Sequence, residues 1–373
     1  MVKVNSHISS YNPNDAIFLL KDISDLMKES STETREQAIQ AGTHYSEMLP
    51  MEYKPSKAYM DLFFSSLQQY KHKLAIAVGV VAEQIIQTKG TNLVLISLAR
   101  AGTPIGILIK RYIRYQYNLD VPHYCISIVR GRGIDENALH YILEHHPKET
   151  IQFIDGWTGK GAIKKELEYA VHTFNERNNT HISHCMAVLA DPGYCTSIYG
   201  TREDFLIPSA CLNATVSGLI SRTVLNDTYI GPKDFHGVKY YKELEQEDLS
   251  NFFVDEVTDL FPSVHSHIDN QLRYITSTYT DPSWQGLKDI QSIQNHFKID
   301  DINLIKPGVG ETTRVLLRRI PWKILIRQQN NPDLKHILLL AKEKNVPIEI
   351  YENMAYSYCG LIKPLRTCLK SGV

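Results

Sequence analysis

Two glycine-rich turns each follow an apolar run and precede an amphipathic segment. The first, residues 99–103 (ARAGT), comes after the apolar run 93–97, and the second, residues 155–161 (DGWTGKG), comes after 151–154. A turn that opens a helix offers unpaired backbone N–H groups and the positive end of the helix dipole, which together attract phosphate. Asp155 and Lys160 add a carboxylate and a cation to the second turn. The two turns therefore predict a ligand that carries more than one phosphate group.

Strand-like runs that alternate with helical patterns must position these turns. The runs cover residues 93–97, 124–129, 151–154 and 186–190, and apolar residues at helical spacing separate them. Such alternation predicts an α/β protein with a mostly parallel sheet and helices on both faces. Because parallel strands end at one edge, both turns and the basic turn 130–133 are expected at the same edge, where α/β proteins bind ligands.

The length of 373 residues favours more than one domain. We expect a helical N-terminal extension over residues 1–90, a ligand-binding α/β domain with a covering hood over 91–240, and an acidic helical linker over 241–299. A new strand–helix pattern begins near residue 300 and predicts a small α/β domain over 300–373.

The composition is typical of a folded protein and carries almost no net charge. Hydrophobic residues make up 43% of the chain, charged residues 22%, and the formal net charge is −1, so a nucleic-acid site would have to be local. No stretch offers the ~20 apolar residues of a membrane helix, and the first residues lack a secretion signal. The six cysteines are scattered without a Cys-x-x-Cys pair. These features predict a cytoplasmic protein with reduced thiols and leave its oligomeric state open.

The two turns resemble those of type I phosphoribosyltransferases, in which one loop binds the ribose 5-phosphate of PRPP and the other its pyrophosphate. Gly156 stands where that family has a second acidic residue. The resemblance implies Mg²⁺ held through Asp155, and PRPP or a nucleotide-like small molecule as ligand. The catalytic residues that it implies are Arg100 and Asp155. Arg130 and Arg132 are added as catalytic candidates because their turn is expected at the same edge, where they could bind pyrophosphate; a solvated basic turn is the alternative. The ligand-binding residues that it implies are Ala99, Ala101, Gly102, Thr158, Gly159 and Gly161, with Lys160 inside the second loop. Thr103, which can cap the helix after the first loop, and Gly156 complete the predicted ligand-binding residues.

Longer strings resemble the StiP family, phosphoribosyltransferase-like proteins of bacterial tellurite-resistance and stress gene clusters. They are HYSEMLP (44–50), SLARAGTPIG (97–106), HYCISIVRGRGIDENAL (123–139), FIDGWTGKGAI (153–163) and GTREDFLIPSACLNATVSGLISRTVLN (200–226). We therefore expect a phosphoribosyltransferase-like enzyme. Because some members of this family are named cysteine proteases, the alternative is a cysteine protease with Cys211 as nucleophile. A third possibility is a nucleotide- or RNA-binding protein without catalysis.

Residues 300–365 resemble the pelota RNA-binding fold. Its RNA-gripping turn is matched by Gly308, Glu311, Thr313 and Arg314, while Gly310 replaces the Asn of that pattern. A carboxylate can accept from base amino groups and an arginine can meet phosphates. The resemblance implies RNA as a partner of this part of the chain, and a protein-contact role is the alternative.

Overall fold

The computed structural model describes residues 8–329 and 334–363. Its main sheet runs in the order β1-β6-β5-β8-β9-β10, and neighbouring strands along this path are parallel. The strands are β1 (Ile17–Phe18), β5 (Leu93–Ala99), β6 (His123–Val129), β8 (Thr150–Trp157), β9 (Met186–Ala190) and β10 (Ile198–Thr201). The chain is thus a mixed α/β protein with a mostly parallel central sheet.

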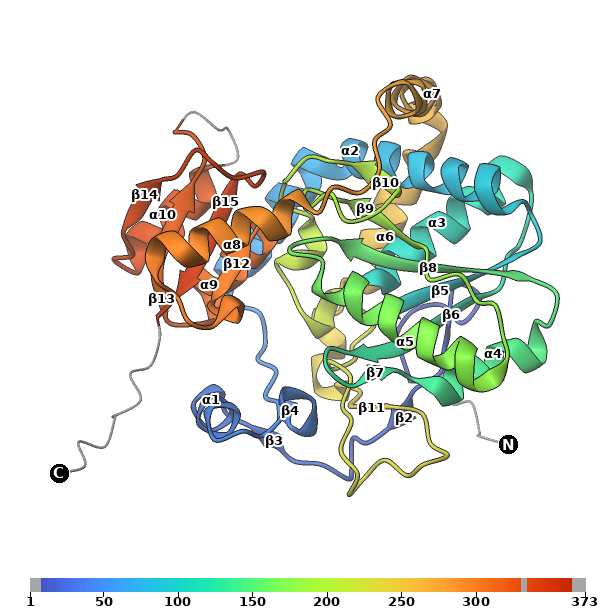
Figure 1. Cartoon of the computed structure of the whole chain (residues 1–373), viewed down its shortest axis with the longest axis horizontal. Helices are drawn as coiled ribbons and strands as arrows, with labels where there is room; N and C mark the ends of the chain where they lie inside the picture. The colour runs from blue at the N-terminus through green and yellow to red at the C-terminus, as the bar shows by residue number, and fades with distance from the viewer. Residues whose placement is uncertain (1–7, 330–333, 364–373) are drawn as a thin grey trace.

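Helices cover both faces of this sheet (Figure 1). One face carries α2 (Lys57–Lys89), α3 (Gly102–Tyr117), α6 (Ser250–Thr258) and α7 (Phe261–Ser277), and the other carries α4 (Glu136–His145) and α5 (Ala162–Asn178). The central strands are buried along almost their whole length, which explains their unbroken apolar runs. After the basic turn the chain reverses, and β7 (Gly133–Ile134) pairs antiparallel with the end of β6.

The N-terminal segment differs from the helical prediction. Ile17 and Phe18 form β1, which pairs with β6 at the edge of the main sheet, and three further two-residue strands follow. These are β2 (Lys21–Asp22), β3 (Glu29–Ser30) and β4 (Leu49–Pro50), with α1 (Thr32–Gln40) and the short helix η1 (Tyr45–Glu47) between the last two. Strands of two residues are too short to show an alternating pattern, so the apolar spacing alone indicated a helix.

The segment after β10 supplies the hood. It contains the short helices η2 (Pro208–Ala210), η3 (Ala214–Val216) and η4 (Lys242–Glu247), and β11 (Gly237–Val238) pairs with β2. This pairing ties the hood to the N-terminal segment.

The C-terminal part has its own four-stranded sheet, in the order β12-β15-β13-β14. After α8 (Gln285–Phe297) and the short helix η5 (Ile302–Leu304) it comprises β12 (Ile305–Pro307), α9 (Val309–Arg318), β13 (Pro321–Ile326), α10 (Leu334–Glu343), β14 (Ile348–Ile350) and β15 (Tyr358–Ile362). The strand β15, which the sequence patterns missed, lies between β12 and β13. None of the described helices is both long and apolar enough to cross a membrane.

Candidate functional site

The carboxyl ends of β5, β6, β8 and β9 gather the loops that the sequence singled out. The turn after β5 packs tightly on the end of β8: a Cβ on Gly102 would lie 2.5 Å from the Ile154 carbonyl oxygen. Thr158 N–H donates to the Ala190 carbonyl (3.0 Å), which joins the loop after β8 to the end of β9. The parallel sheet therefore brings the predicted loops to one edge, as expected.

Arg100 is held by the hood. Its guanidinium donates to the Ile220 carbonyl (3.0 Å) and to Asn213 Oδ1 (3.1 Å), and Glu52 lies 3.9 Å away. Burial lowers the pKa of Arg100, and the Glu52 carboxylate opposes that shift. The side chain thus joins the hood to the turn after β5.

Asp155 is a buried carboxylate at the end of β8. Its Oδ1 accepts from Gly156 N–H (2.7 Å), and burial raises the pKa of this carboxyl to about 7 despite that bond and the charge of Arg314. Among the described residues no three His, Cys, Asp or Glu side chains come together as a metal site, so Asp155 is not part of such a group.

Lys160 points into the C-terminal part of the chain. Its Nζ donates to the Ile302 carbonyl (2.8 Å) and to Asn303 Oδ1 (3.2 Å), and Arg130 Nη1 donates to the same Asn303 oxygen (3.0 Å). Arg132, on the same turn as Arg130, pairs with Glu47 instead. These loops therefore hold the two parts of the chain together.

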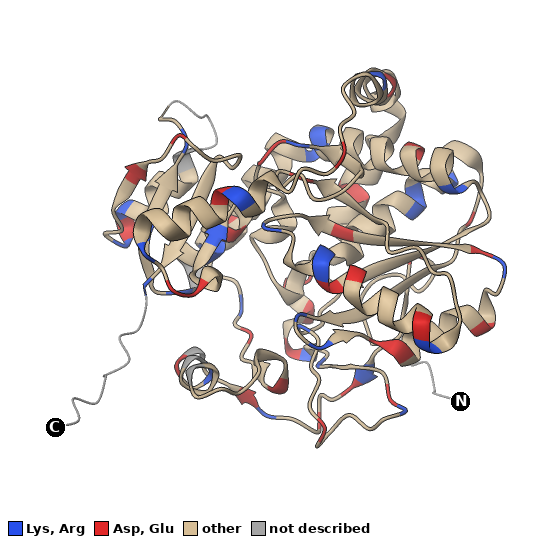
Figure 2. Cartoon of the chain, in the orientation of Figure 1, with Lys and Arg blue, Asp and Glu red and all other residues tan. Residues whose placement is uncertain are grey.

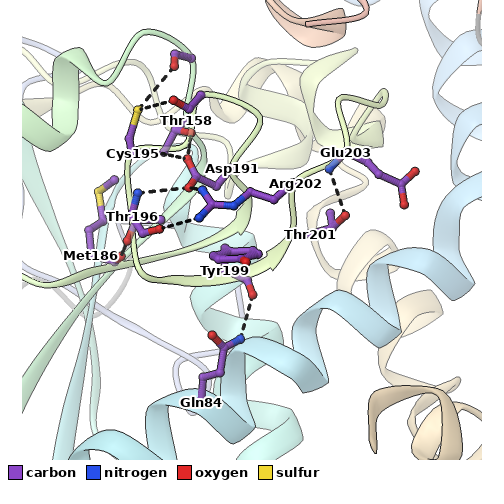
Figure 3. Close-up of polar contacts among 12 residues, drawn as sticks. Gln84, Thr158, Met186, Asp191, Cys195, Thr196, Tyr199, Thr201, Arg202 and Glu203 are labelled. Carbon is purple, nitrogen blue, oxygen red and sulfur yellow. Dashed lines mark hydrogen bonds and ion pairs between the residues drawn. The ribbon is translucent and has the colours of Figure 1, made fainter. Parts of the chain in front are cut away.

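A buried polar network links the loops after β8 and β9 (Figure 3). Asp191 accepts from the Thr158 hydroxyl, from the backbone N–H groups of Cys195 (2.9 Å) and Thr196 (3.1 Å), and from the Arg202 guanidinium. Each carboxylate oxygen thus has two donors. Such a saturated network fixes the position of the loop that carries Cys195.

Arg202 closes this network from β10. Its guanidinium carbon lies 3.8 Å from the centre of the Tyr199 ring and 4.4 Å from that of Tyr194. A guanidinium on aromatic faces is stabilised by cation–π attraction and stays charged. A permanent cation therefore lies beside Asp191 and close to Cys195.

Cys195 is covered by neighbouring glycines. Its thiol donates to the carbonyls of Gly193 (3.4 Å) and Gly159 (3.8 Å), and only 1% of the residue is exposed. Burial raises the pKa of the thiol to about 12 and Asp191 adds to the shift, whereas Arg202 and Lys165 lower it. The covered thiol is therefore protonated at neutral pH.

Cys211 lies elsewhere in the hood. It follows η2, has no exposed surface, and its sulfur lies 3.8 Å from Ser66 Oγ on α2. The other described cysteines are Cys125 within β6, Cys185 just before β9 and Cys359 within β15, and all five are free thiols. Cys368 lies outside the described residues.

Asp204 fastens the C-terminal part to this edge. Its two carboxylate oxygens accept from Val309 N–H (2.9 Å), at the start of α9, and from Ser357 N–H (2.8 Å). Burial raises the pKa of Asp204 to about 6, although these donors oppose the shift. A carboxylate thus lies at the start of α9, where the helix dipole and the unpaired N–H groups favour a negative charge.

The segment around α8 covers the Cys195 loop. Gly286 N–H donates to the Gly193 carbonyl (3.0 Å) and the Tyr356 hydroxyl donates to the Gly159 carbonyl (3.0 Å). A Cβ on Gly161 would lie 2.4 Å from the Trp284 ring and 2.9 Å from the Cys195 sulfur, so both side chains pack against that glycine.

The turn predicted to grip RNA faces the sheet edge. Glu311 pairs with Arg314 (3.1 Å), and the Arg314 guanidinium lies 5.0 Å from the centre of the Trp157 ring. Thr313 is fully buried, and Gly308 is next to Asp204. A cavity remains between the sheet edge, the hood and this turn; it is lined by Trp157, Thr158, Ala190, Pro192, Glu203, Asp204, Phe205, Ile207, Ala210, Pro307, Gly308 and Gly310.

The sequence patterns single out neither Cys195 nor the contacts that Asp204 makes with the C-terminal part. One sequence signal points to Cys195. It lies four residues after Asp191, and Asp191 directly follows the predicted strand 186–190. Nothing local indicated Asp204, because its partners lie more than 100 residues further along the chain.

Comparisons with known proteins fit this two-part organisation. Residues 9–258 match the family model described as tellurite-like stress resistance cysteine protease StiP, and residues 284–364 match the PELOTA RNA binding domain. A cysteine protease StiP from Acinetobacter baylyi is 30% identical over 368 residues, which cover 94% of this chain and 92% of that protein.

The similarity to solved structures is weak, with low TM-scores. Hypoxanthine phosphoribosyltransferase from Trypanosoma cruzi is 16% identical, over 48% of this chain and 93% of that one, with a TM-score of 0.24. A hypothetical protein from Neisseria gonorrhoeae with bound ppGpp is 14% identical, over 38% of this chain and 73% of that one, with a TM-score of 0.20.

The expectation of a phosphoribosyltransferase acting on PRPP is wrong, since the family model and the curated relative both name a cysteine protease. The match to the family model and the identity to the curated relative show that the chain belongs to the StiP family.

Proposed function

We propose that this chain is a cysteine peptidase with an RNA-binding C-terminal part. The observation that carries the peptidase is the 30% identity, along nearly the whole chain, to a protein named cysteine protease StiP. A cysteine peptidase needs a thiol that can become a thiolate next to a site for the peptide.

Cys195 is the thiol that the geometry favours. It lies at the carboxyl edge of the sheet, where α/β proteins bind ligands, and its neighbours Thr158 and Pro192 line the cavity. Cys125 and Cys359 lie within buried strands, and Cys185 precedes β9 at the opposite edge. Cys211 packs against α2, and it is the alternative that the sequence favours.

The surroundings of Cys195 combine a covered thiol with two cations. Arg202 and Lys165 favour the thiolate, whereas burial and the Asp191 carboxylate oppose it. Movement of Trp284 and the C-terminal part away from the loop would admit water, so the pKa of Cys195 would fall toward its ordinary value. We therefore propose that the observed arrangement is the covered, resting state.

In the uncovered state the thiolate attacks the carbonyl carbon of a peptide bond. The peptide C–N bond breaks, the leaving amine takes up a proton from solvent water, and a thioester joins the acyl fragment to Cys195. Water then hydrolyses the thioester, which releases the carboxylic acid and restores the thiol. Arg202 and Lys165 stabilise the thiolate before attack.

The peptidase is tested by hydrolysis of fluorescently labelled casein. Wild type, Cys195→Ser, Cys211→Ser and the control Cys185→Ser are compared, each also in a Trp284→Ala background that uncovers the loop. We expect loss of activity in Cys195→Ser alone. Loss of activity in Cys211→Ser alone would show that Cys211, not Cys195, is the nucleophile. Absence of thiol-dependent hydrolysis in every background would refute the proposed peptidase activity.

RNA binding is proposed for a separate reason, the match of residues 284–364 to the PELOTA RNA binding domain. Fluorescence anisotropy of the full chain with a fluorescein-labelled 20-nucleotide RNA tests it. We expect saturable binding that weakens with salt, and no binding at low salt would overturn this part of the proposal.

A further inference from the structure

Cations from separate segments meet where the C-terminal part joins the main body. Arg130 comes from the turn after β6, Lys160 from the turn after β8, Arg222 from the hood and Lys306 from β12. We call these four side chains the basic seam. Lys and Arg segments lie on both sides of this junction (Figure 2).

The hydrogen bonds of the basic seam go to neutral acceptors. Arg130 and Lys160 donate to Asn303 Oδ1 and Lys160 to the Ile302 carbonyl, and all of these acceptors are neutral. Within residues 8–329 and 334–363, none of the four cations forms an ion pair with a carboxylate at the distances that define one. The carboxylates of Asp301 and Glu311 act on Lys160 and Lys306 through space and oppose part of the seam's charge.

The local potential at the seam is positive. Burial lowers the pKa of Lys160 to about 8, and Lys306 and Arg130 contribute to this shift. Burial likewise lowers the pKa of Lys306; Glu311 opposes this shift, and Arg319 and Arg130 add to it. Cations that lower one another's pKa in this way are stabilised when an anion binds between them.

The turn that carries Arg130 is fixed before any ligand arrives. Glu166 accepts from the N–H groups of Gly131 (2.6 Å) and Gly133 (2.9 Å), and Arg130 N–H donates to the Tyr45 hydroxyl (2.9 Å). A preset turn loses little entropy when it binds.

An aromatic ring lies within the seam. The guanidinium carbons of Arg130 and Arg222 lie 5.8 and 5.7 Å from the centre of the Tyr45 ring, and Tyr45 is half-buried. Cations that track a backbone beside an aromatic ring are the combination that single-stranded nucleic acids use, with phosphates on the cations and a base on the ring.

We propose that a single RNA strand binds along the basic seam, so that RNA recognition uses side chains of the main body as well as of the C-terminal part. The inference rests on the RNA binding proposed above. It places the strand on the surface beside the predicted turn, whose Thr313 and Gly308 face inward. RNA at the seam would contact both parts of the chain at once.

The test measures binding of the labelled 20-nucleotide RNA to full chains that lack main-body cations. The variants are Arg130→Gln, Lys160→Gln, Arg222→Gln and the triple combination. The matched control is Lys148→Gln, which removes an exposed cation just before β8, at the opposite edge of the sheet. Thermal unfolding of each variant establishes that it is folded.

We expect the triple variant to bind at least about tenfold more weakly and its salt slope to fall by about 2, because each phosphate contact on a single strand contributes about 0.7. The control should bind like wild type. If the wild type binds RNA and the triple variant binds equally well, the inference fails while RNA binding stands. If the wild type binds no RNA, both fail. If polyglutamate competes as well as unlabelled RNA, the seam is a site for acidic peptides and the inference also fails.

Discussion

Asp155→Asn isolates the free energy of burying one carboxylate at the carboxyl end of β8. Burial raises the pKa of Asp155 to about 7, above the ordinary value of about 4. The folded chain therefore binds this proton more tightly than the unfolded chain does. Stability falls as the pH rises from about 4 to about 7 and then stays at the lower level, because ionisation of Asp155 opposes folding.

The magnitude follows from the size of the shift. About three pKa units correspond to about 4 kcal/mol once the group is fully ionised in both states. Asparagine keeps an oxygen for the Gly156 N–H bond and carries no charge. Between pH 5 and pH 8 the variant should therefore gain on the order of 3 kcal/mol of unfolding free energy relative to wild type.

Urea unfolding followed by tryptophan fluorescence at pH 5, 6.5 and 8 measures this difference. The control is Asp61→Asn, which makes the same change at an exposed position on α2. A difference between Asp155→Asn and wild type that stays constant across this range would refute the reasoning.

Three further perturbations test the packing around Cys195 and Asp204. Trp284→Ala should speed alkylation of Cys195 by iodoacetamide at pH 8, by about tenfold for each unit that the thiol pKa falls; peptide mapping by mass spectrometry that finds an unchanged rate would contradict the covering role. Asp204→Ala should weaken docking of the C-terminal part by about 1–3 kcal/mol, because two backbone donors lose their acceptor; limited proteolysis should then cut faster between residues 278 and 284, and an unchanged pattern would count against it. Gly193→Ala should destabilise the fold by about 1–3 kcal/mol, since the new Cβ would lie 2.0 Å from the Gly159 carbonyl oxygen; an unaltered melting temperature would exclude this close approach.

Much of the central sheet could be predicted from sequence because its strands are buried on both faces. The predicted runs 93–97, 124–129, 151–154 and 186–190 lie within β5, β6, β8 and β9. Patterns of this kind report burial directly. The shared edge of the loops followed from parallel topology alone.

The glycine turns illustrate why the predicted chemistry failed where the predicted topology succeeded. Gly102 is required because the turn after β5 packs on the end of β8, and Gly193 because its loop passes close to Gly159. A close approach of two backbones needs glycine whether or not a phosphate binds. Short glycine motifs therefore located the loops correctly, whereas the phosphoribosyltransferase activity inferred from them is wrong.

Contacts distant in sequence account for what was missed. Lys160 meets Ile302 across 142 residues, and Asp204 meets Ser357 across 153 residues. No local pattern carries such a pairing. The covering of Cys195 by Trp284 and Tyr356 is likewise visible only in the folded chain.

The most direct measurement of the central claim compares casein hydrolysis by Trp284→Ala with that by Trp284→Ala/Cys195→Ser. We expect hydrolysis that iodoacetamide abolishes in the first variant, and no hydrolysis in the second. Equal hydrolysis by the two variants would contradict the assignment of Cys195 as the nucleophile.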